Sequence, residues 1–162
     1  MQEKAQYYRF ISASAPKRIT VRSVTYNDIA HGITAFFTEF FEGAFTFENE
    51  INLDRTTTVG VEGLAYFLKR LLQQIYNGKM MKILFFTDER DLKISIKWPD
   101  KDLLKEKSFA ELYKLASDSK FEVEFNDGEA LMILRNTPAS MIEFHATTEF
   151  IMERILVEVF FS

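Results

Sequence analysis

The stretch from Val61 to Trp98 constrains the fold more than any other part of this chain. Apolar residues at helical spacing in VEGLAYFLKRLLQQIYNG predict an amphipathic helix that ends near Asn77 and Gly78. The next stretch, MKILFFTDERDLKISIKWP, has an apolar run over 83–86 before a charged tip and alternates apolar and polar residues over 92–97 after it, which predicts two strands joined by a solvated turn. An amphipathic helix beside a hairpin buries its apolar side against the sheet, so this stretch predicts an α+β domain.

The residues before this stretch predict a strand, a helix and a second strand. Thr25 or Asn27 can cap the helix, Asp28 lies in its first turn, and Gly43 stops it. The predicted order is a strand over 17–24, a helix from Thr25 to Gly43, a strand over 45–53 and a polar loop over 54–58.

The residues after Trp98 predict a short helix and a second hairpin. Ser108 can cap a helix over 109–117, with Glu111 at the capping-box position. Strands over 121–125 and 130–135 flank the turn sequence Asn126-Asp127-Gly128.

Beyond Pro138, two apolar segments, 141–145 and 150–161, are predicted as strands. Alternate residues at the end of the second segment are apolar, while a helix from Thr148 competes with this interpretation.

These elements predict one domain over residues 1–162. We expect an irregular lead over 1–16, a core over 25–136 and a C-terminal addition over 139–162. The expected fold class is an α+β two-layer sandwich. Its mixed or antiparallel sheet is covered by about three helices and extended by a C-terminal apolar hairpin.

Composition excludes several classes of protein. The apolar runs are too short to cross a bilayer, and MQEKAQYYRF lacks the apolar core of a signal peptide, so we expect no membrane partner and a cytoplasmic location. The absence of cysteine rules out disulfides, thiolate catalysis and cysteine-bound metal. The net charge is −4 and Lys and Arg are dispersed, which argues against a nucleic-acid partner.

Seventeen phenylalanines, many in adjacent pairs, are the compositional oddity. Adjacent residues cannot all face one small core, so some must face a second layer or a partner chain. The pairs are Phe36-Phe37, Phe40-Phe41, Phe85-Phe86 and Phe160-Phe161.

Segments over residues 25–136 resemble, in order, the catalytic domain of sensor histidine kinases, within the wider ATPase family that includes gyrase, the Hsp90 chaperones and MutL. SVTYNDIAHGITAFF resembles the segment that enters that domain, and LAYFLKRLLQQIYNG resembles its asparagine-bearing helix. LKISIKW resembles the strand before its adenine-reading aspartate, and FAELYKLASDSKFEVEFNDGEALMILRN resembles its last helix and hairpin.

The same resemblance implies residues that this sequence lacks. The asparagines that hold magnesium on the triphosphate correspond to Arg70 and Gln74, and Arg70 cannot ligate a cation. Trp98 replaces the adenine-reading aspartate, unless Asp100 serves instead. A phosphate-binding lid needs glycine, and none occurs between Gly78 and Gly128. These departures argue against an ATP-hydrolysing or kinase activity, and we assign no catalytic, cofactor-binding or metal-binding residue.

Two histidines and a charged turn are further candidate sites. Asp28-Ile29-Ala30-His31 is similar to the phosphoacceptor box of histidine kinases, but Gly32 stands where that box has an acid, so His31 is interpreted as a partly buried helix residue. His145 has no suggestive partner for a nucleophilic triad. The turn from Asp88 to Asp91 implies no set of metal ligands.

The expected function is a non-catalytic, histidine-kinase-like regulatory module that binds itself or a protein partner. One alternative is a phosphorelay or nucleotide-sensing protein that keeps a weakened ancestral site, and another is an unrelated small-molecule-binding α+β domain. The C-terminal segment carries too much apolar surface to lie free in water. If both of its faces are apolar, one needs a second chain, so the sequence predicts a homodimer through Phe150 to Phe161.

Overall fold

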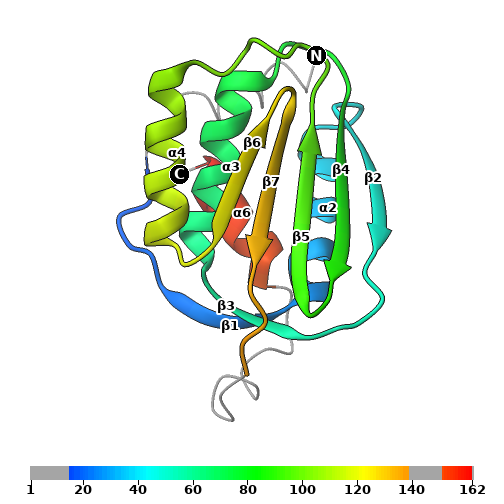
Figure 1. Ribbon diagram of the computed structural model, residues 1–162, viewed down its shortest axis with the longest axis vertical. Helices are drawn as coiled ribbons and strands as arrows, with labels where there is room; N and C mark the ends of the chain where they lie inside the picture. The colour runs from blue at the N-terminus through cyan, green and yellow to red at the C-terminus, as the bar shows by residue number, and fades with distance from the viewer. Residues whose placement is uncertain (1–14, 139–150, 162) are drawn as a thin grey trace.

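The computed structural model describes residues 15–138 and 151–161, which contain a mixed five-stranded sheet, a separate two-stranded ribbon and helices on one side of the sheet (Figure 1). The elements are β1 (Val21–Thr25), α2 (Tyr26–Phe40), β2 (Phe45–Glu50), β3 (Thr56–Gly60), α3 (Val61–Ile75), β4 (Met81–Asp88), β5 (Asp91–Lys97), α4 (Glu106–Asp118), β6 (Glu122–Asn126), β7 (Glu129–Leu134) and α6 (Ile151–Phe161). The predicted α+β class and mixed sheet are confirmed.

The large sheet has the strand order β2-β4-β5-β7-β6. β2 runs parallel to β4, and the other neighbouring strands are antiparallel. β1 and β3 pair antiparallel in the separate ribbon, which crosses the lower end of the molecule in Figure 1. An isolated bridge from Thr57 to Asn136 joins this ribbon to the segment after β7.

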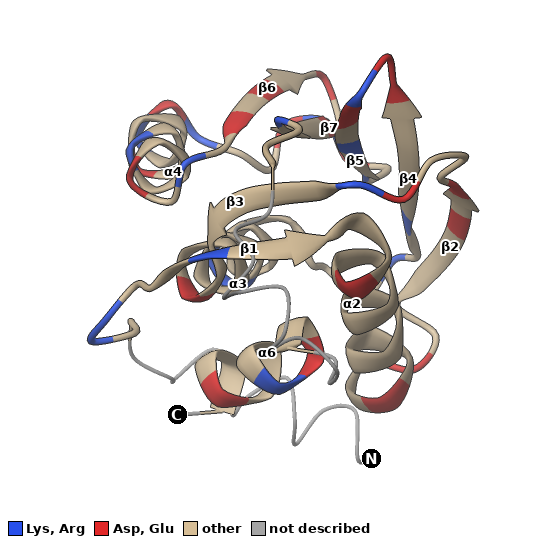
Figure 2. Cartoon of the chain, turned by 90° about the horizontal axis from the view of Figure 1, so that it is seen from below, with Lys and Arg blue, Asp and Glu red and all other residues tan. Residues whose placement is uncertain are grey.

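Alternation along the strands turns one face of the sheet toward the helices. Phe85 of β4 and Ile94 of β5 are fully buried on that face, whereas their neighbours Phe86 and Lys93 lie on the other face and are partly exposed. α2, α3 and α4 cover the buried face (Figure 2). The sheet covered by three helices is therefore as predicted from the sequence.

A further helix, α6, packs on α2 and α3 on the side away from the sheet (Figure 2). The ring centroids of Phe36 in α2 and Phe160 in α6 are 4.8 Å apart, while Phe37 faces Phe45 of β2 at 4.7 Å. Adjacent phenylalanines of α2 thus serve two different layers. The second layer that the paired phenylalanines require lies within the chain.

Charged side chains from the helices beneath hold both ends of α6. The carboxylate of Asp28, in the first turn of α2, accepts a hydrogen bond from the N–H of Met152 at 3.3 Å. The ammonium of Lys69, on α3, donates to the carbonyl oxygen of Val159 at 3.1 Å. A helix carries partial positive charge at its N-terminus and partial negative charge at its C-terminus, so each ion matches the end that it contacts.

Burial opposes the charge on both of these side chains. Burial raises the pKa of Asp28, although the N–H groups of Met152 and Ile151 and the charge of His31 lower it in part. Burial lowers the pKa of Lys69 to about 8, and the neighbouring positive charge of Arg70 acts in the same direction. Lys69 is 0% exposed, so its only favourable electrostatic surroundings are protein groups such as the end of α6.

Two predicted elements are wrong. The strand over 150–161 is helix α6, because the apolar residues that alternate at its end also fall within a broad apolar helical face. The polar loop over 54–58 contains the start of β3, whose threonines pair with β1. The other half of the predicted C-terminal hairpin, 141–145, lies outside the described residues, as does most of the lead over 1–16.

Element ends differ from the predictions in smaller ways. Thr25 caps α2 as predicted, with its Oγ1 accepting from the N–H of Asp28 at 3.1 Å. α4 begins at Glu106 rather than Phe109, and its N-cap residue is Lys105 rather than Ser108. β1 and β2 cover only part of the predicted ranges. Among the described residues, no helix is long and apolar enough to cross a bilayer.

Gly32→Ala is expected to lower the free energy of unfolding by about 1 to 3 kcal/mol through overpacking. A Cβ at Gly32 would lie 2.6 Å from both the Cβ of Met152 and the backbone nitrogen of Glu153. At an unobstructed helix position the same change would stabilise by roughly 0.5 to 1 kcal/mol. Urea unfolding measures the effect. Thr38→Ala, at an exposed position of the same helix, is the control and should change stability by less than about 0.5 kcal/mol.

The stability of the wild type relative to Lys69→Met is expected to rise between pH 8 and about pH 10.4. Lys69 has a pKa of about 8 in the folded chain, whereas an unfolded lysine titrates near about 10.4. In this interval the unfolded chain binds more protons, so stability increases with pH by at most about 1.4 kcal/mol per unit. Below pH 8 both states carry the charge, and the whole cost of burying it is present.

Urea unfolding at pH 7.5 and 9.5 gives the two differences. Lys114→Met, which removes an exposed lysine of α4, is the matched control and should show no such trend. Parallel pH profiles for the wild type and Lys69→Met would contradict the prediction.

Candidate functional site

Arg70 and Gln74 lie one turn apart on α3, and both contact α4. Arg70 forms a two-point ion pair with Glu111, with Nε–Oε1 and Nη2–Oε2 distances of 2.8 and 3.1 Å. The Oε1 of Gln74 accepts a hydrogen bond from the Oγ of Ser108 at 3.2 Å. Both side chains therefore join neighbouring helices of this chain.

Hydrogen bonding keeps the Arg70–Glu111 pair ionised. The bond to Glu111 raises the pKa of Arg70, and the same bond lowers the pKa of Glu111. Both side chains are partly exposed, so the pair contributes about 0 to 1 kcal/mol to stability. Glu111 was predicted to complete a capping box with Ser108. In the structure both side chains instead bond to side chains of α3, Glu111 to Arg70 and Ser108 to Gln74.

Trp98 and Asp100 have different surroundings. Trp98 follows the inward-facing residues of β5 and is 6% exposed. Its backbone N–H donates to the carbonyl oxygen of Gly128 at 3.0 Å. Its indole Nε1 is buried without a hydrogen-bond partner in the described part of the chain. Asp100 lies in an exposed ion pair with Lys79 at 3.0 Å, and the hydrogen bond from Lys79 lowers the pKa of Asp100.

The remaining candidates from the sequence are His31, His145 and the charged turn. His31 is exposed on α2 rather than partly buried as predicted, and its charge acts on Asp28. Asp88 pairs with Lys93 at 2.7 Å, at one end of the charged turn. His145 lies outside the described residues. Over 15–138 and 151–161, no group of three or more His, Asp or Glu residues is arranged to hold a metal ion.

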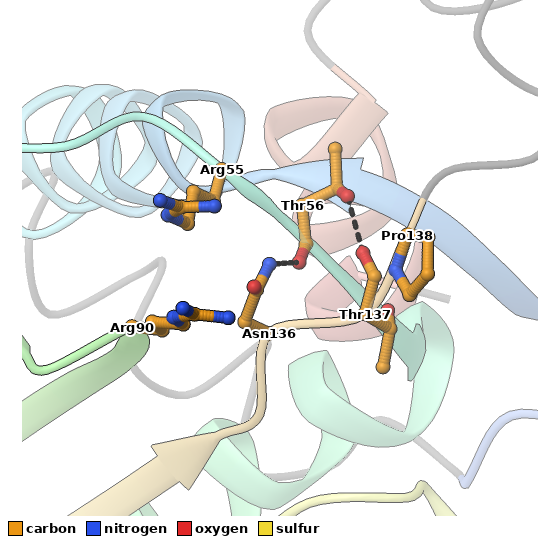
Figure 3. Close-up of a pocket in the computed structure, with 6 residues that line it drawn as sticks. All are labelled: Arg55, Thr56, Arg90, Asn136, Thr137 and Pro138. Atoms are coloured by element: carbon orange, nitrogen blue, oxygen red, sulfur yellow. Dashed lines mark hydrogen bonds between the residues drawn. The ribbon is translucent and has the colours of Figure 1, made fainter.

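A pocket of about 510 Å³ lies at the opposite end of β5, where the β4–β5 turn meets the start of β3 and the segment after β7 (Figure 3). Arg55 and Arg90 enter it from separate elements, and Figure 3 shows both guanidinium groups beside Asn136. None of the described residues that line it is acidic. The lining residues are Arg55, Thr56, Arg90, Asn136, Thr137 and Pro138.

Hydrogen bonds fix the wall of this pocket. Thr56 and Thr137 are joined twice: the N–H of Thr137 donates to Thr56 O at 2.9 Å, and the hydroxyl of Thr56 donates to Thr137 O at 2.5 Å. Asn136 Nδ2 also donates to Thr56 O, at 3.0 Å, and Asn136 N donates to the Asp91 carboxylate at 2.9 Å. The segment after β7 is therefore hydrogen-bonded both to the start of β3 and to the start of β5.

Sequence reasoning missed this pocket and the role of Lys69. The sequence placed Arg55 in a polar loop and Arg90 in a solvated turn. The two are separated by 34 residues, and no sequence pattern indicated that they lie at one pocket. Lys69 had a visible signal. It stands among apolar residues in a helix that is buried on two sides, a position where a lysine needs a partner.

The fold of this chain is similar to those of solved histidine kinase structures. The catalytic domain of the histidine kinase ThkA, in a nucleotide-free form, superposes with a TM-score of 0.51 at 14% identity, covering 75% of this chain and 99% of that one. ThkA in complex with the response regulator TrrA gives a TM-score of 0.51 at 16% identity, covering 81% of this chain and 46% of that one.

The fold is thus that of histidine kinase catalytic domains, as the order of elements predicted. No family model and no curated protein sequence matches the chain. At these identities the likeness concerns the fold alone.

Proposed function

We propose that this chain is a non-catalytic, histidine-kinase-like regulatory domain that acts by binding a protein partner or a second copy of itself. The observation that carries the proposal is the contact between α3 and α4. The side chains at the positions of the kinases' magnesium ligands, Arg70 and Gln74, are engaged by Glu111 and Ser108. The burial of Trp98 where those enzymes carry an adenine-reading aspartate supports the same role.

A nucleotide-sensing or phosphorelay protein with a weakened site is the second candidate. The amide oxygen of Gln74 favours it, because that oxygen can ligate a cation if the bond from Ser108 opens. The guanidinium of Arg70, one turn away, opposes it by repelling the same cation. The ThkA–TrrA complex shows that a kinase with this fold binds a response regulator, and it supports protein binding as the role of this chain.

No binding of ATP is expected at physiological magnesium, because the cation ligands and the adenine acceptor are replaced. Isothermal titration of the whole chain with ATP and magnesium tests this. The control is the double variant Arg55→Gln/Arg90→Gln. ATP that is held only through its phosphates by the two arginines of the pocket in Figure 3 would no longer bind to this variant. A micromolar dissociation constant with one site per chain, retained by the double variant, would overturn the proposal.

Self-association through the C-terminal segment stays a prediction, and the structure limits the surface available for it. The apolar face of α6 is buried within the chain, so burial no longer requires a second copy. The outward stripe carries Arg154, Val157 and Glu158. Two such stripes can pair antiparallel with each arginine facing the other copy's glutamate, as a two-fold symmetric contact requires.

A homodimer at tens of micromolar is expected by light scattering, and Val157→Asp should convert it to a monomer. The added carboxylate would lie unpaired at the centre of the contact, next to Glu158. Met80→Asp, at a residue 55% exposed between α3 and β4, is the control and should leave the dimer intact. A monomeric wild type, or a dimer unaffected by Val157→Asp, would contradict the prediction.

A further inference from the structure

Arg55 and Arg90 place two unpaired cations at one pocket. Within the described part of the chain, neither guanidinium forms an ion pair, and the Nε of Arg55 is buried without a hydrogen-bond partner. A buried donor left without a hydrogen-bond partner destabilises the folded chain, and more so when it is charged. An acceptor from outside the chain would remove this destabilisation.

Two acidic residues next to the arginines in sequence, Asp91 and Asp54, already accept hydrogen bonds from other groups. Asp91, next to Arg90 in sequence, accepts from Arg135 Nη1 and Asn136 N, both at 2.9 Å. The hydrogen bond from Asn136 lowers the pKa of Asp91, with Arg135 acting in the same direction. Asp54, next to Arg55, accepts from the backbone N–H of Asn27 at 3.1 Å. These contacts direct the carboxylates of Asp54 and Asp91 to other partners. Among the described residues, the charged side chains that line the pocket are the two arginines.

Tyr26 fixes the backbone of both arginines. This residue begins α2 and is fully buried; its N–H donates to Arg55 O at 2.9 Å, and its hydroxyl donates to Arg90 O at 2.5 Å. Burial, and secondly the charge of Asp91, raise the pKa of Tyr26 to about 12, so the hydroxyl stays a donor at neutral pH. One buried residue, through its backbone N–H and its hydroxyl, thus holds both arginine-bearing segments in place before any ligand binds, which lowers the ordering cost of binding.

The chemistry of the pocket selects an anion with several oxygens. Each guanidinium offers five N–H donors in a planar fork that matches two oxygens of a carboxylate or phosphate. A single carboxylate accepts one fork, whereas a phosphate group has enough oxygens to accept from two forks. The hydroxyls of Thr56 and Thr137 are already bonded within the wall, so the arginines are the recognition groups.

We propose that the pocket between Arg55 and Arg90 binds the phosphate group of a small phosphorylated ligand. The site is separate from the face where the kinase fold would hold nucleotide. β5 runs from Asp91, next to Arg90, to Lys97, next to Trp98, so Arg90 and Trp98 lie roughly 25 Å apart along an extended strand. The proposal therefore goes beyond the proposed function and does not depend on it.

Isothermal titration of the full chain with pyrophosphate, inorganic phosphate and succinate, without magnesium and at low ionic strength, tests the proposal. One site per chain is expected, with pyrophosphate binding most tightly and succinate at least tenfold more weakly. Arg90→Gln and Arg55→Gln should each weaken pyrophosphate binding at least fivefold. Arg55→Lys, which keeps the charge but loses the fork, should weaken it less than Arg55→Gln.

Arg18→Gln is the matched control, because it removes an exposed arginine that does not line the pocket and should leave pyrophosphate affinity unchanged. Thermal unfolding checks that each variant folds. Arg90 lies in an exposed turn, so Arg90→Gln keeps the test valid if Arg55→Gln fails to fold. Failure to bind pyrophosphate at millimolar concentration, tighter binding of succinate, or equal losses in Arg90→Gln and Arg18→Gln would each overturn the proposal.

Discussion

The arrangement of the helices depends on how α6 is held. A carboxylate from α2 meets the N-terminus of α6 and an ammonium from α3 meets its C-terminus, so charges on two helices match the two ends of the third. Hydrophobic burial alone is non-directional and would allow α6 to slide or reverse on the apolar surface beneath it. Asp28 and Lys69 remove that freedom, because reversing α6 would bring each ion against the wrong end of the helix.

The sheet and α6 together explain the unusual aromatic content. α2 and α3 lie between two layers and must be apolar on two sides, which a helix in a two-layer sandwich does not need. Phe36 packs on Phe160 of α6, while Phe37 packs on Phe45 of β2. The close approach at Gly32 brings Met152 to the surface of α2, where a larger residue would hold the two helices apart. The core is thus continuous through three layers of structure.

The two ends of β5 divide the regions of functional interest. At one end, Trp98 is buried, and Arg70 and Gln74 bond to residues of α4. At the other end, the turn that carries Arg90 meets Arg55 beside a pocket whose described lining residues include no acid. Arg70 pairs with Glu111, whereas neither Arg55 nor Arg90 pairs with an acid of the described residues. This contrast supports a different surface for ligand recognition from the one used by the kinases.

The sequence by itself determined the local elements and the class of fold. Helix α3, the β4–β5 hairpin and the β6–β7 hairpin followed from short-range periodicity and turn residues, and the order of elements identified the histidine-kinase-like arrangement. It also placed Arg70 and Gln74 one turn apart on a helix. The sequence could not predict which residues bond to these side chains, because Glu111 and Ser108 lie on another helix.

Only the tertiary structure decided three features. It made 151–161 a helix, since its apolar residues fit a broad helical face as well as an alternating strand and the partners α2 and α3 settle the choice. It gave β3 its identity through pairing with β1, because Thr56 to Thr58 carry no apolar pattern of their own. It also brought Arg55 to Arg90 through the contacts of Tyr26. In each case the deciding contact joins residues far apart in the chain, and local sequence patterns do not indicate which distant residues come into contact.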